Sequence, residues 1–467
     1  MRRSGSGGVH DHVFPATGEI QGQVPLAGTT EVDEAASAAQ AAFPSWRALP
    51  PAERSRLLRR LAELMERDAD ELARLSVLDN GMTARMARPL VDIMTSWTAY
   101  YAGWADKIEG RVTSTPSSGR ELAFTVPEPY GVVGIILTWN GPVVSVGMKL
   151  IPALAAGNTV VLKPSELTPY ATEHLMALVR EAGIPHGVVN LVLGGPDTGD
   201  ALVRHRLVKK VSFTGGPSTA RKILTACAES LKPAVLELGG KSANIIFPDG
   251  DLETAVMRSA SGVFGTMAGQ GCALGTRLVV HADLYDEVAD RAVAIASSMR
   301  CGDPLDPTCA VGPVVTRSAQ QRILGLIERA QSDGAQLLAG GAAPDGSDRG
   351  FYVQPTVIGD VDPASELGQV EVFGPVLSLQ RFETEEQAIS IANSTEYGLA
   401  SYLYTRDVDR VQRLVPQLQA GGVYVNGASS VVGCELPFGG IGVSGFGREG
   451  GEEGLFEFLQ TKAVAIR

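Results

Sequence analysis

Five short apolar runs between residues 131 and 240 decide the fold: GVVGIIL (131–137), NTVVLK (158–163), VVNLVL (188–193), KKVSFTG (209–215) and PAVLELGG (233–240). Segments with helical spacing, such as 170–182 and 219–230, lie between these runs. Strands that alternate with helices of about a dozen residues form βαβ units and a parallel sheet. The sequence therefore predicts an α/β fold in this region.

Polar side chains follow several of the predicted strands. Asn140, Lys163, Thr214 and Glu237 all lie where an apolar run ends. In open α/β sheets, ligands bind at the carboxyl ends of the strands, where loops meet the N-termini of helices. We therefore expect the chemistry of the protein at this edge of the sheet.

The rest of the chain predicts further elements. After about residue 241 a second α/β segment follows, with expected helices at 252–267, 284–299 and 319–331. The C-terminal TKAVAIR is expected to form a strand, with the alternating segment 121–127 as its hairpin or sheet partner. The pair Thr168-Pro169 predicts an N-cap followed by proline at the first position of the next helix.

The composition excludes several function classes. Of the 467 residues, 44% are hydrophobic and 20% charged, and the mean hydropathy of +0.07 indicates enough apolar area for large cores. A mainly disordered chain is excluded, because disorder needs low hydrophobicity and high net charge. The net charge of −12 opposes binding to nucleic acid or to an anionic membrane. No run of 18 apolar residues is present, so no membrane-spanning helix is expected.

The five cysteines are odd in number, thinly spread and without a CxxC pair. This pattern argues against a disulfide framework or a zinc site, and the six histidines show no metal-binding spacing. We therefore expect reduced thiols, a cytoplasmic location and no metal. The first residues, MRRSGSGGVHDH, lack the apolar stretch of a signal peptide.

Three residues have surroundings that suit covalent chemistry. Cys272 lies in AGQGCALGTR, whose glycines allow close backbone approach and leave the cysteine N–H to donate to an oxyanion. Glu237 ends an apolar run, where burial would raise its pKa towards that of a general base. Asn140 could donate its amide to the same oxyanion. An inert buried cysteine, a salt-bridged glutamate and a turn-forming Asn-Gly pair are the alternatives.

Two glycine-rich stretches are candidates for phosphate binding. In SFTGGPSTARKI a strand runs through Gly215 and Gly216 into a helix, so N–H groups and the helix dipole point at a ligand there. The alternative is that Gly215 and Gly216 form only a tight turn between the strand and the helix and bind no ligand. GIGVSG (440–445) matches GxGxxG in form, but it opens no expected helix, and we interpret it as a structural loop.

These residues belong to a series of ordered motifs. The motifs are FPATGEI, YYAGWADKIEG, LTWNGPV, MKLIPALAAGNTVVLKPSE, SFTGG, LELGGKSANII, GQGCALGTR, EVFGPV and PFGGIGVSGFGRE. With them the chain resembles the NAD(P)-dependent aldehyde dehydrogenase superfamily over about residues 14–467, most closely its hydrolytic, broad-substrate branch. The resemblance implies an aldehyde dehydrogenase-like α/β fold: a Rossmann-type cofactor domain, an α/β catalytic domain and a small oligomerisation β element.

The resemblance implies a role for each catalytic candidate. The Cys272 thiolate would add to an aldehyde to give a thiohemiacetal, whose oxyanion is held by the Asn140 amide and the Cys272 backbone N–H. Hydride would leave to NAD(P), and water activated by Glu237 would hydrolyse the resulting thioester to the carboxylic acid. Lys149 matches a lysine near the catalytic centre.

The resemblance also implies the cofactor contacts. Lys163 and Glu166 match the pair at the adenosine ribose, where a carboxylate favours NAD because it repels the 2′-phosphate of NADP. NADP is the alternative cofactor. The other matching residues lie at the pyrophosphate, at the nicotinamide ribose and ring, or beside them: Gly215, Gly216, Glu371, Phe373 and Trp139.

The implied organisation is a homodimer or homotetramer that acts on a small-molecule aldehyde, with no nucleic acid or membrane as partner. We expect the cofactor domain at 1–112 and 130–240 and the catalytic domain at 241–445. The oligomerisation strands are expected at 113–129 and 453–467.

Two other functions stay open on the sequence alone. In a CoA-acylating semialdehyde dehydrogenase, CoA takes the acyl group and the general-base glutamate is usually absent, whereas Glu237 is present. A non-catalytic binding member would lose its nucleophile or its base.

In this chain Gly141 and Gly271 replace larger residues of the family beside Asn140 and Cys272, which predicts a wider substrate tunnel for a bulky, aromatic or branched aldehyde.

Overall fold

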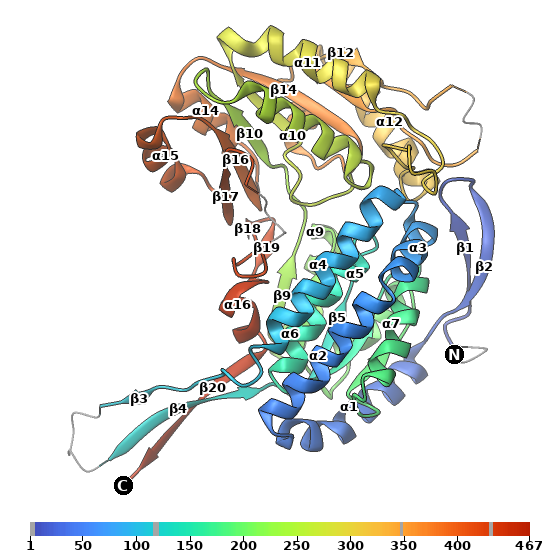
Figure 1. The fold of residues 1–467 in the computed structure, drawn as a ribbon, viewed down its shortest axis with the longest axis vertical. Coiled ribbons are helices and arrows are strands. Elements are labelled where there is room, and N and C mark those ends of the chain that lie inside the picture. The colour runs from blue at the N-terminus through green and yellow to red at the C-terminus, as the bar shows by residue number, and fades with distance from the viewer. Residues whose placement is uncertain (1–4, 115–120, 346–348, 429–432) are drawn as a thin grey trace.

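The computed structural model describes residues 5–114, 121–345, 349–428 and 433–467 of the chain. Two α/β sheets and their helices form an upper and a lower lobe, and a narrow arm of strands projects from the lower one (Figure 1). The predicted α/β fold is confirmed, and the lower lobe holds the region from 131 to 240 that the sequence singles out.

The lower lobe is built on the predicted parallel sheet. Its strand order is β19-β9-β8-β5-β6-β7, and the pairings are parallel except that of β19 with β9. The strands are β5 (Val132–Ile136), β6 (Thr159–Lys163), β7 (Val189–Leu191), β8 (Val208–Thr214), β9 (Ala234–Glu237) and β19 (Gly445–Phe446). Every residue of β5 and β6 is buried, as in strands that helices cover on both faces.

Successive side chains of β5 point to opposite faces of this sheet and enter different cores. Val133 and Ile135 pack with one group of helices, whereas Val132 and Ile136 pack with another. The first group is α2 (Pro51–Arg67), α3 (Ala69–Asn80), α4 (Ala84–Ala102), α5 (Pro142–Ser145), the π-helical turn η1 (Val146–Leu150), α6 (Ile151–Ala155) and α7 (Tyr170–Glu181). The second is α1 (Thr29–Ala48), α8 (Pro196–Arg204) and α9 (Pro217–Glu229).

The upper lobe is a seven-stranded sheet in the order β12-β13-β14-β11-β10-β16-β17, antiparallel only between β12 and β13. Its strands are β10 (Ala243–Ile246), β11 (Arg277–His281), β12 (Gln336–Ala339), β13 (Thr356–Gly359), β14 (Val376–Phe382), β16 (Ala400–Tyr404) and β17 (Gly422–Val425). One face packs on α10 (Leu252–Gly265), α11 (Tyr285–Ser298) and α12 (Arg317–Ser332), and the other on α14 (Glu385–Ala392) and α15 (Val408–Leu414).

The arm confirms the predicted pairing of the C-terminal strand with the alternating segment. β20 (Leu459–Ile466) pairs antiparallel with β4 (Leu122–Pro129), and β3 (Val112–Thr113) pairs with the other edge of β4. The remaining short elements are β1 (Val9–Phe14), β2 (Glu19–Pro25), η2 (Met267–Gly269), η3 (Ala282–Leu284), α13 (Glu366–Gln369), β15 (Tyr397–Gly398), η4 (Val415–Gln417), β18 (Ile441–Gly442) and α16 (Gly451–Phe456).

The start of α7 differs from the prediction. The helix begins at Tyr170 with Pro169 as its N-cap, and the buried Thr168 hydroxyl has no hydrogen-bond partner among the described residues. Asp79, at the end of α3, caps the helix instead, because its carboxylate accepts the N–H groups of Tyr170 (2.8 Å) and Ala171 (3.0 Å). A proline N-cap offers no side-chain acceptor, so a neighbouring helix satisfies the first turn of α7.

Candidate active site

Two loops and the end of strand β9 carry the predicted catalytic residues to one place. Asn140 lies in the loop after β5, Glu237 is the last residue of β9, and Cys272 follows η2. The Asn140 side-chain amide donates to the Gln270 carbonyl (2.7 Å), two residues before Cys272. The segment after Glu237 lies against the same loop, since a Cβ added to Gly240 would clash with the Cys272 carbonyl oxygen. The structure therefore brings together residues that are up to 132 positions apart in the sequence (from 140 to 272).

Cys272 is half-buried, and its environment favours the neutral thiol. Burial, with the nearby charges of Glu371 and Glu237, raises the pKa of Cys272 to about 12. A base must therefore accept the proton when the sulfur attacks an electrophile. The Cys272 N–H has no acceptor in another residue within the described chain, so it is available to an oxyanion.

Glu237 has the surroundings of a general base. Its side chain is buried, and neither carboxyl oxygen has a hydrogen-bond partner among the residues that the structure describes. Burial, followed by the charge of Glu449, raises the pKa of Glu237 well above its usual range, and the positive charges of Lys149 and Arg448 oppose this rise. A carboxylate whose pKa is raised in this way is a stronger base than an exposed one, which suits proton acceptance from substrate or water.

Lys149 lies in η1 and is fully buried. Its ammonium group donates to Ser212 Oγ (3.1 Å) and forms an ion pair with Glu449. A buried ammonium group needs such partners, because an isolated charge is strongly destabilised away from water. Glu449 was missed by the sequence reasoning, although it ends the motif PFGGIGVSGFGRE, and no spacing rule connects it with a lysine 300 residues earlier.

Asn140 is itself held in place by residues that the sequence analysis did not single out. Asn80, the last residue of α3, donates its side-chain amide to the carbonyl groups of Trp139 (3.0 Å) and Asn140 (3.2 Å). Gln270 accepts the Asn140 amide and is anchored by its own side chain, which accepts the N–H of Val315 (3.0 Å). In the sequence, the feature that could have pointed to Gln270 is its position two residues before Cys272, in GQGC.

The residues predicted at the nicotinamide end lie beside the catalytic loops. The rings of Trp139 and Phe373 meet edge to face, with centroids 5.4 Å apart. Glu371 accepts the Gly240 N–H (2.9 Å), and burial raises the pKa of Glu371 to about 7. Gly239 must lack a side chain, because a Cβ there would clash with the Glu371 carboxylate. Glu371 is thus joined to the loop that follows Glu237, and Phe373 to the loop that carries Asn140.

The residues predicted at the adenosine ribose face the start of α8. Lys163 ends β6 and is buried, which lowers its pKa, and its ammonium group donates to the Pro164 carbonyl (3.0 Å). The Lys163 stem lies 3.7 Å from the position of a Cβ at Gly199 in α8. Glu166 Oε1 lies 3.9 Å from the position of a Cβ at Gly195, the N-cap of α8.

The Gly-Gly turn opens α9. Gly216 is the N-cap of α9, and a Cβ there would meet no atom within 4 Å among the described residues. Gly215 donates its N–H to the Glu237 carbonyl (3.1 Å), and a Cβ at 215 would clash with the Phe213 ring. An open helix N-terminus at the same edge of the parallel sheet as Lys163, the last residue of β6, fits a phosphate-bearing dinucleotide.

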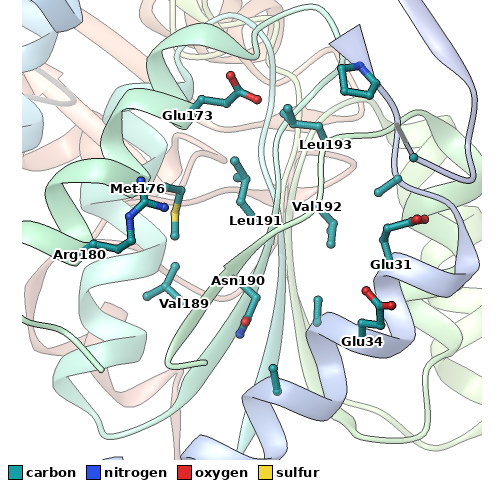
Figure 2. A pocket seen from close by; sticks show the side chains of 15 residues that line it. Glu31, Glu34, Glu173, Met176, Arg180, Val189, Asn190, Leu191, Val192 and Leu193 are labelled. Atoms are coloured by element: carbon teal, nitrogen blue, oxygen red, sulfur yellow. The ribbon is translucent and has the colours of Figure 1, made fainter. Parts of the chain in front are cut away.

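A separate cavity lies away from these residues. It has a volume of about 570 Å³ and lies beside β7, between α1 and α7 (Figure 2). Glu31, Glu34, Glu173 and Arg180 are on its wall, and none of the predicted catalytic residues lines it.

Among the described residues no group of three or more His, Cys, Asp or Glu could hold a metal ion. Within the same residues, no helix combines the length and the apolar composition of a membrane span.

Comparison with known proteins identifies a family. The model of the aldehyde dehydrogenase family matches residues 2–464. The chain is 43% identical over 461 residues to the mitochondrial aldehyde dehydrogenase of Homo sapiens, covering 97% of this chain and 88% of that protein. It is 42% identical to cytosolic aldehyde dehydrogenase 1 of Mus musculus, covering 97% and 90% of the two chains.

Solved structures of other proteins superpose on nearly the whole of this chain. The NAD+ complex of an aldehyde dehydrogenase from Bacillus cereus superposes with a TM-score of 0.95 at 38% identity, covering 98% of this chain and 93% of that one. PnpE in complex with nicotinamide adenine dinucleotide gives a TM-score of 0.95 at 41% identity, covering 99% and 94%. The chain therefore belongs to the aldehyde dehydrogenase family, and as one of its enzymes it oxidises an aldehyde to the carboxylic acid with NAD(P) as hydride acceptor.

Proposed function

We propose that Cys272, Asn140 and Glu237 are the nucleophile, the oxyanion donor and the general base of this oxidation. The observation that carries the proposal is the contact of the Asn140 amide with the Cys272 loop, 2.7 Å from the Gln270 carbonyl. This contact supports the proposal, because it joins the Asn140 amide to the loop that also carries the backbone N–H of the nucleophile. Two such donors stabilise a developing alkoxide, each by about 3 kcal/mol.

Each residue acts at a defined point of the cycle. As the Cys272 sulfur attacks the aldehyde carbon, its proton passes to a base, and the buried carboxylate of Glu237 suits this acceptance. The Asn140 amide and the Cys272 N–H hold the resulting oxyanion. The bound cofactor supplies the hydride acceptor. Glu237 then takes a proton from the water that hydrolyses the thioester, and Lys149 favours the ionised form of Glu237 that can accept it.

NAD is the proposed cofactor, and its binding residues are those that match the family. Glu166 and Lys163 would hold the adenosine ribose, Gly216 and the start of α9 the pyrophosphate, and Glu371 with Phe373 the nicotinamide riboside. The carboxylate of Glu166 disfavours a 2′-phosphate. The NAD complexes of the Bacillus cereus enzyme and of PnpE, which superpose on this chain, support the assignment.

The proposed substrate is a bulky, aromatic or branched aldehyde, and the support comes from Gly141 alone. A Cβ at Gly141 would meet no described atom within 4 Å, so space is open beside Asn140. Gly271 does not widen the site as expected, because the Leu274 side chain lies 2.9 Å from the position of a Cβ there. We expect Gly141→Phe to lower kcat/KM for an aromatic aldehyde about tenfold relative to acetaldehyde. Wild-type activity on acetaldehyde alone would contradict the proposal.

A cytoplasmic homodimer or homotetramer is the proposed state of the enzyme. The arm of β3, β4 and β20 extends from the body, and its outer strands present unpaired backbone edges within the described chain (Figure 1). Exposed edges of this kind pair readily with a second copy. The five described cysteines are free, which suits a reducing compartment.

The test is reduced-nicotinamide absorbance with purified protein, a panel of aldehydes, and NAD or NADP. We expect steady turnover that falls by at least about 10⁴-fold in Cys272→Ala. Turnover that continues only after CoA is added would favour the acylating alternative. Cofactor binding without any oxidation of the panel would favour the non-catalytic one.

A further inference from the structure

A buried histidine on the hairpin of β1 and β2, which lies beside α3 (Figure 1), has no part in the mechanism above. The Nε2 atom of His12 lies 3.0 Å from the carbonyl oxygen of Leu167, the residue after Glu166. We propose that His12 is a positioning residue of the cofactor site. It fixes the loop of residues 164–168 (the Glu166 loop) and thereby the carboxylate that disfavours NADP. The proposal rests on the proposed function of Glu166.

The hydrogen bonds around the His12 ring determine which of its nitrogen atoms carries the hydrogen. The Gln21 Nε2 atom donates to the Leu78 carbonyl (2.6 Å), which fixes the orientation of this side-chain amide. The same atom lies 3.0 Å from His12 Nδ1, which must therefore accept its second hydrogen. Burial lowers the pKa of His12, so the ring is neutral at pH 7 and its own hydrogen is on Nε2. His12 consequently donates to the Leu167 carbonyl.

The His12 ring is held on several sides. It is 1% exposed and packs on the ring of Tyr170, with centroids 4.7 Å apart. The hairpin approaches this contact closely, since a Cβ at Gly22, the strand partner of His12, would lie 2.8 Å from the Tyr170 hydroxyl oxygen. Asp79 Oδ1, which accepts the Tyr170 N–H, lies 4.0 Å from His12 Nε2. The donor is therefore fixed relative to the start of α7.

The bond from His12 supports the Glu166 loop from outside. The loop makes hydrogen bonds to itself and to its flanks, such as that from the Thr168 N–H to the Ser165 carbonyl (3.1 Å). Among the described residues, His12 makes the only hydrogen bond to this loop from outside residues 163–172. Without it, hydrogen bonds would hold the loop only through its two ends, at β6 and α7.

From Leu167 the support extends to the Glu166 carboxylate. The Leu167 N–H donates to Ser165 Oγ (3.2 Å), and this hydroxyl donates to Glu166 Oε2 (3.5 Å). The other carboxyl oxygen, Oε1, lies 3.9 Å from the position of a Cβ at Gly195, the N-cap of α8. A binding group keeps its position when its own supports are fixed by hydrogen bonds. Loss of the bond at the Leu167 carbonyl therefore loosens Glu166 relative to α8, where we propose that the adenosine ribose binds.

The test measures the use of both cofactors by variants of His12. His12→Met removes the donor and keeps a side chain of similar volume, whereas His12→Gln keeps an amide donor. We expect His12→Met to raise the KM of NAD about fivefold, as for the loss of one hydrogen bond, with kcat and the KM of the aldehyde unchanged. His12→Gln should retain most of the affinity. A lower midpoint of thermal unfolding without a change in the KM of NAD would assign His12 to stability alone and overturn the proposal.

A double-mutant cycle separates positioning from a general loss of stability. In His12→Met the ratio of kcat/KM for NADP to that for NAD should rise, by a smaller factor than in Glu166→Gln. In the Glu166→Gln background, His12→Met should not change this ratio further, because the charge that it positions is absent. An equal change in both backgrounds would overturn the proposal.

His10→Met is the matched control. It removes the same type of side chain from the same strand, and within the described chain His10 makes no hydrogen bond to the Glu166 loop. The KM of NAD and the cofactor ratio should therefore stay at the wild-type values. Equal effects of His10→Met and His12→Met would contradict a specific role of the bond to Leu167.

Failure of the proposed function of Glu166 gives a different result. Hydrogen exchange of residues 164–172 in the cofactor-free protein measures the support of the loop by itself, and His12→Met should accelerate it. If exchange is faster but Glu166→Gln leaves the affinities for NAD and NADP unchanged, the ribose assignment alone fails. If Glu166→Gln changes these affinities but His12→Met changes neither exchange nor the KM of NAD, the His12 proposal alone is overturned.

Discussion

At Glu237, opposite electrostatic influences meet on one carboxyl group. Burial and Glu449 favour its protonated form, whereas Lys149 and Arg448 favour the ionised form. Its two oxygens have no hydrogen-bond donor among the described residues, so no fixed contact must be broken when a water or a thiol proton approaches. In the mechanism that we propose, this balance would allow one group to accept a proton at two steps of the cycle.

Glu237→Gln should separate the two halves of the reaction. The amide cannot take a proton from water, so the thioester should accumulate. We expect a burst of reduced cofactor that approaches one equivalent per active site but forms more slowly than in the wild type, because the Cys272 thiol has also lost its proton acceptor. The steady rate should be lower by about 10²–10⁴-fold. Stopped-flow absorbance measures both quantities, and loss of the burst together with the steady rate would contradict the assignment to thioester hydrolysis.

The pH dependence of steady turnover should follow the ionisation of Glu237. Turnover rises with pH, because only the carboxylate accepts a proton, and the limb should lie above the usual pKa of a carboxyl group. Glu449→Gln removes a charge that raises the pKa of Glu237, so the limb should move to lower pH. Lys149→Met removes a charge that lowers this pKa, so the limb should move to higher pH. Shifts in the same direction for both variants would refute the electrostatic explanation.

At the scale of elements, helix starts organise both the fold and the cofactor site. The N-cap of α9 is a glycine with no side-chain cap, which leaves its first N–H groups open at the carboxyl edge of the lower sheet. In contrast, the start of α7 is closed by Asp79 from α3. The first arrangement suits the proposed binding of the pyrophosphate, whereas the second stabilises the start of α7.

Removal of the Asp79 cap should destabilise the protein. Asp79→Ala leaves two buried N–H groups of α7 without acceptors, which costs about 2–4 kcal/mol in total. We expect a clearly lower midpoint of thermal unfolding, with a smaller decrease for Asp79→Asn, which keeps one acceptor. Thermal unfolding followed by circular dichroism compares the variants. An unchanged midpoint for Asp79→Ala would show that solvent or another group satisfies the helix start.

Cofactor preference should depend on Glu166, beside the N-cap of α8. Glu166→Gln removes the negative charge that disfavours a 2′-phosphate. We expect the ratio of kcat/KM for NADP to that for NAD to rise about tenfold, equivalent to about 1.4 kcal/mol. Glu173→Gln, at a glutamate on the wall of the cavity beside β7, is a control and should leave the ratio unchanged.

At the scale of the whole molecule, the structure of a single chain gives the arm of β3, β4 and β20 no role, and we predict that the arm pairs with a second copy. We expect light scattering after gel filtration to give two or four times the chain mass of 49.0 kDa. Successive residues of a strand point their N–H groups to opposite edges of the strand. Proline lacks this N–H group, so one of the two variants Ala463→Pro and Val464→Pro removes a donor at the outer edge of β20, and the other removes a donor to β4. The variant that removes the outward donor should dissociate and still bind NAD. A wild-type mass of 49.0 kDa would contradict the proposed oligomer.

Much of the fold was predictable, because local patterns encode it. The predicted helix at 170–182 is α7 (Tyr170–Glu181), and the predicted strand partners 121–127 and TKAVAIR pair as β4 and β20. The predicted N-cap of α7 at Thr168 was wrong, because the sequence near Thr168 cannot show that a carboxylate of α3 reaches the start of the helix. The roles of the site residues, and the predicted domain boundaries, stay predictions.

The sequence by itself determined the family, the α/β fold and the identity of Cys272, Asn140 and Glu237 as candidates, because motif order and strand-end positions are local properties. Only the tertiary structure decided that Lys149 is paired with Glu449 and that Leu274 fills the space beside Gly271. Such contacts join residues that are distant in the sequence or depend on side-chain packing. They form only when the chain has folded, and no rule about sequence spacing predicts them.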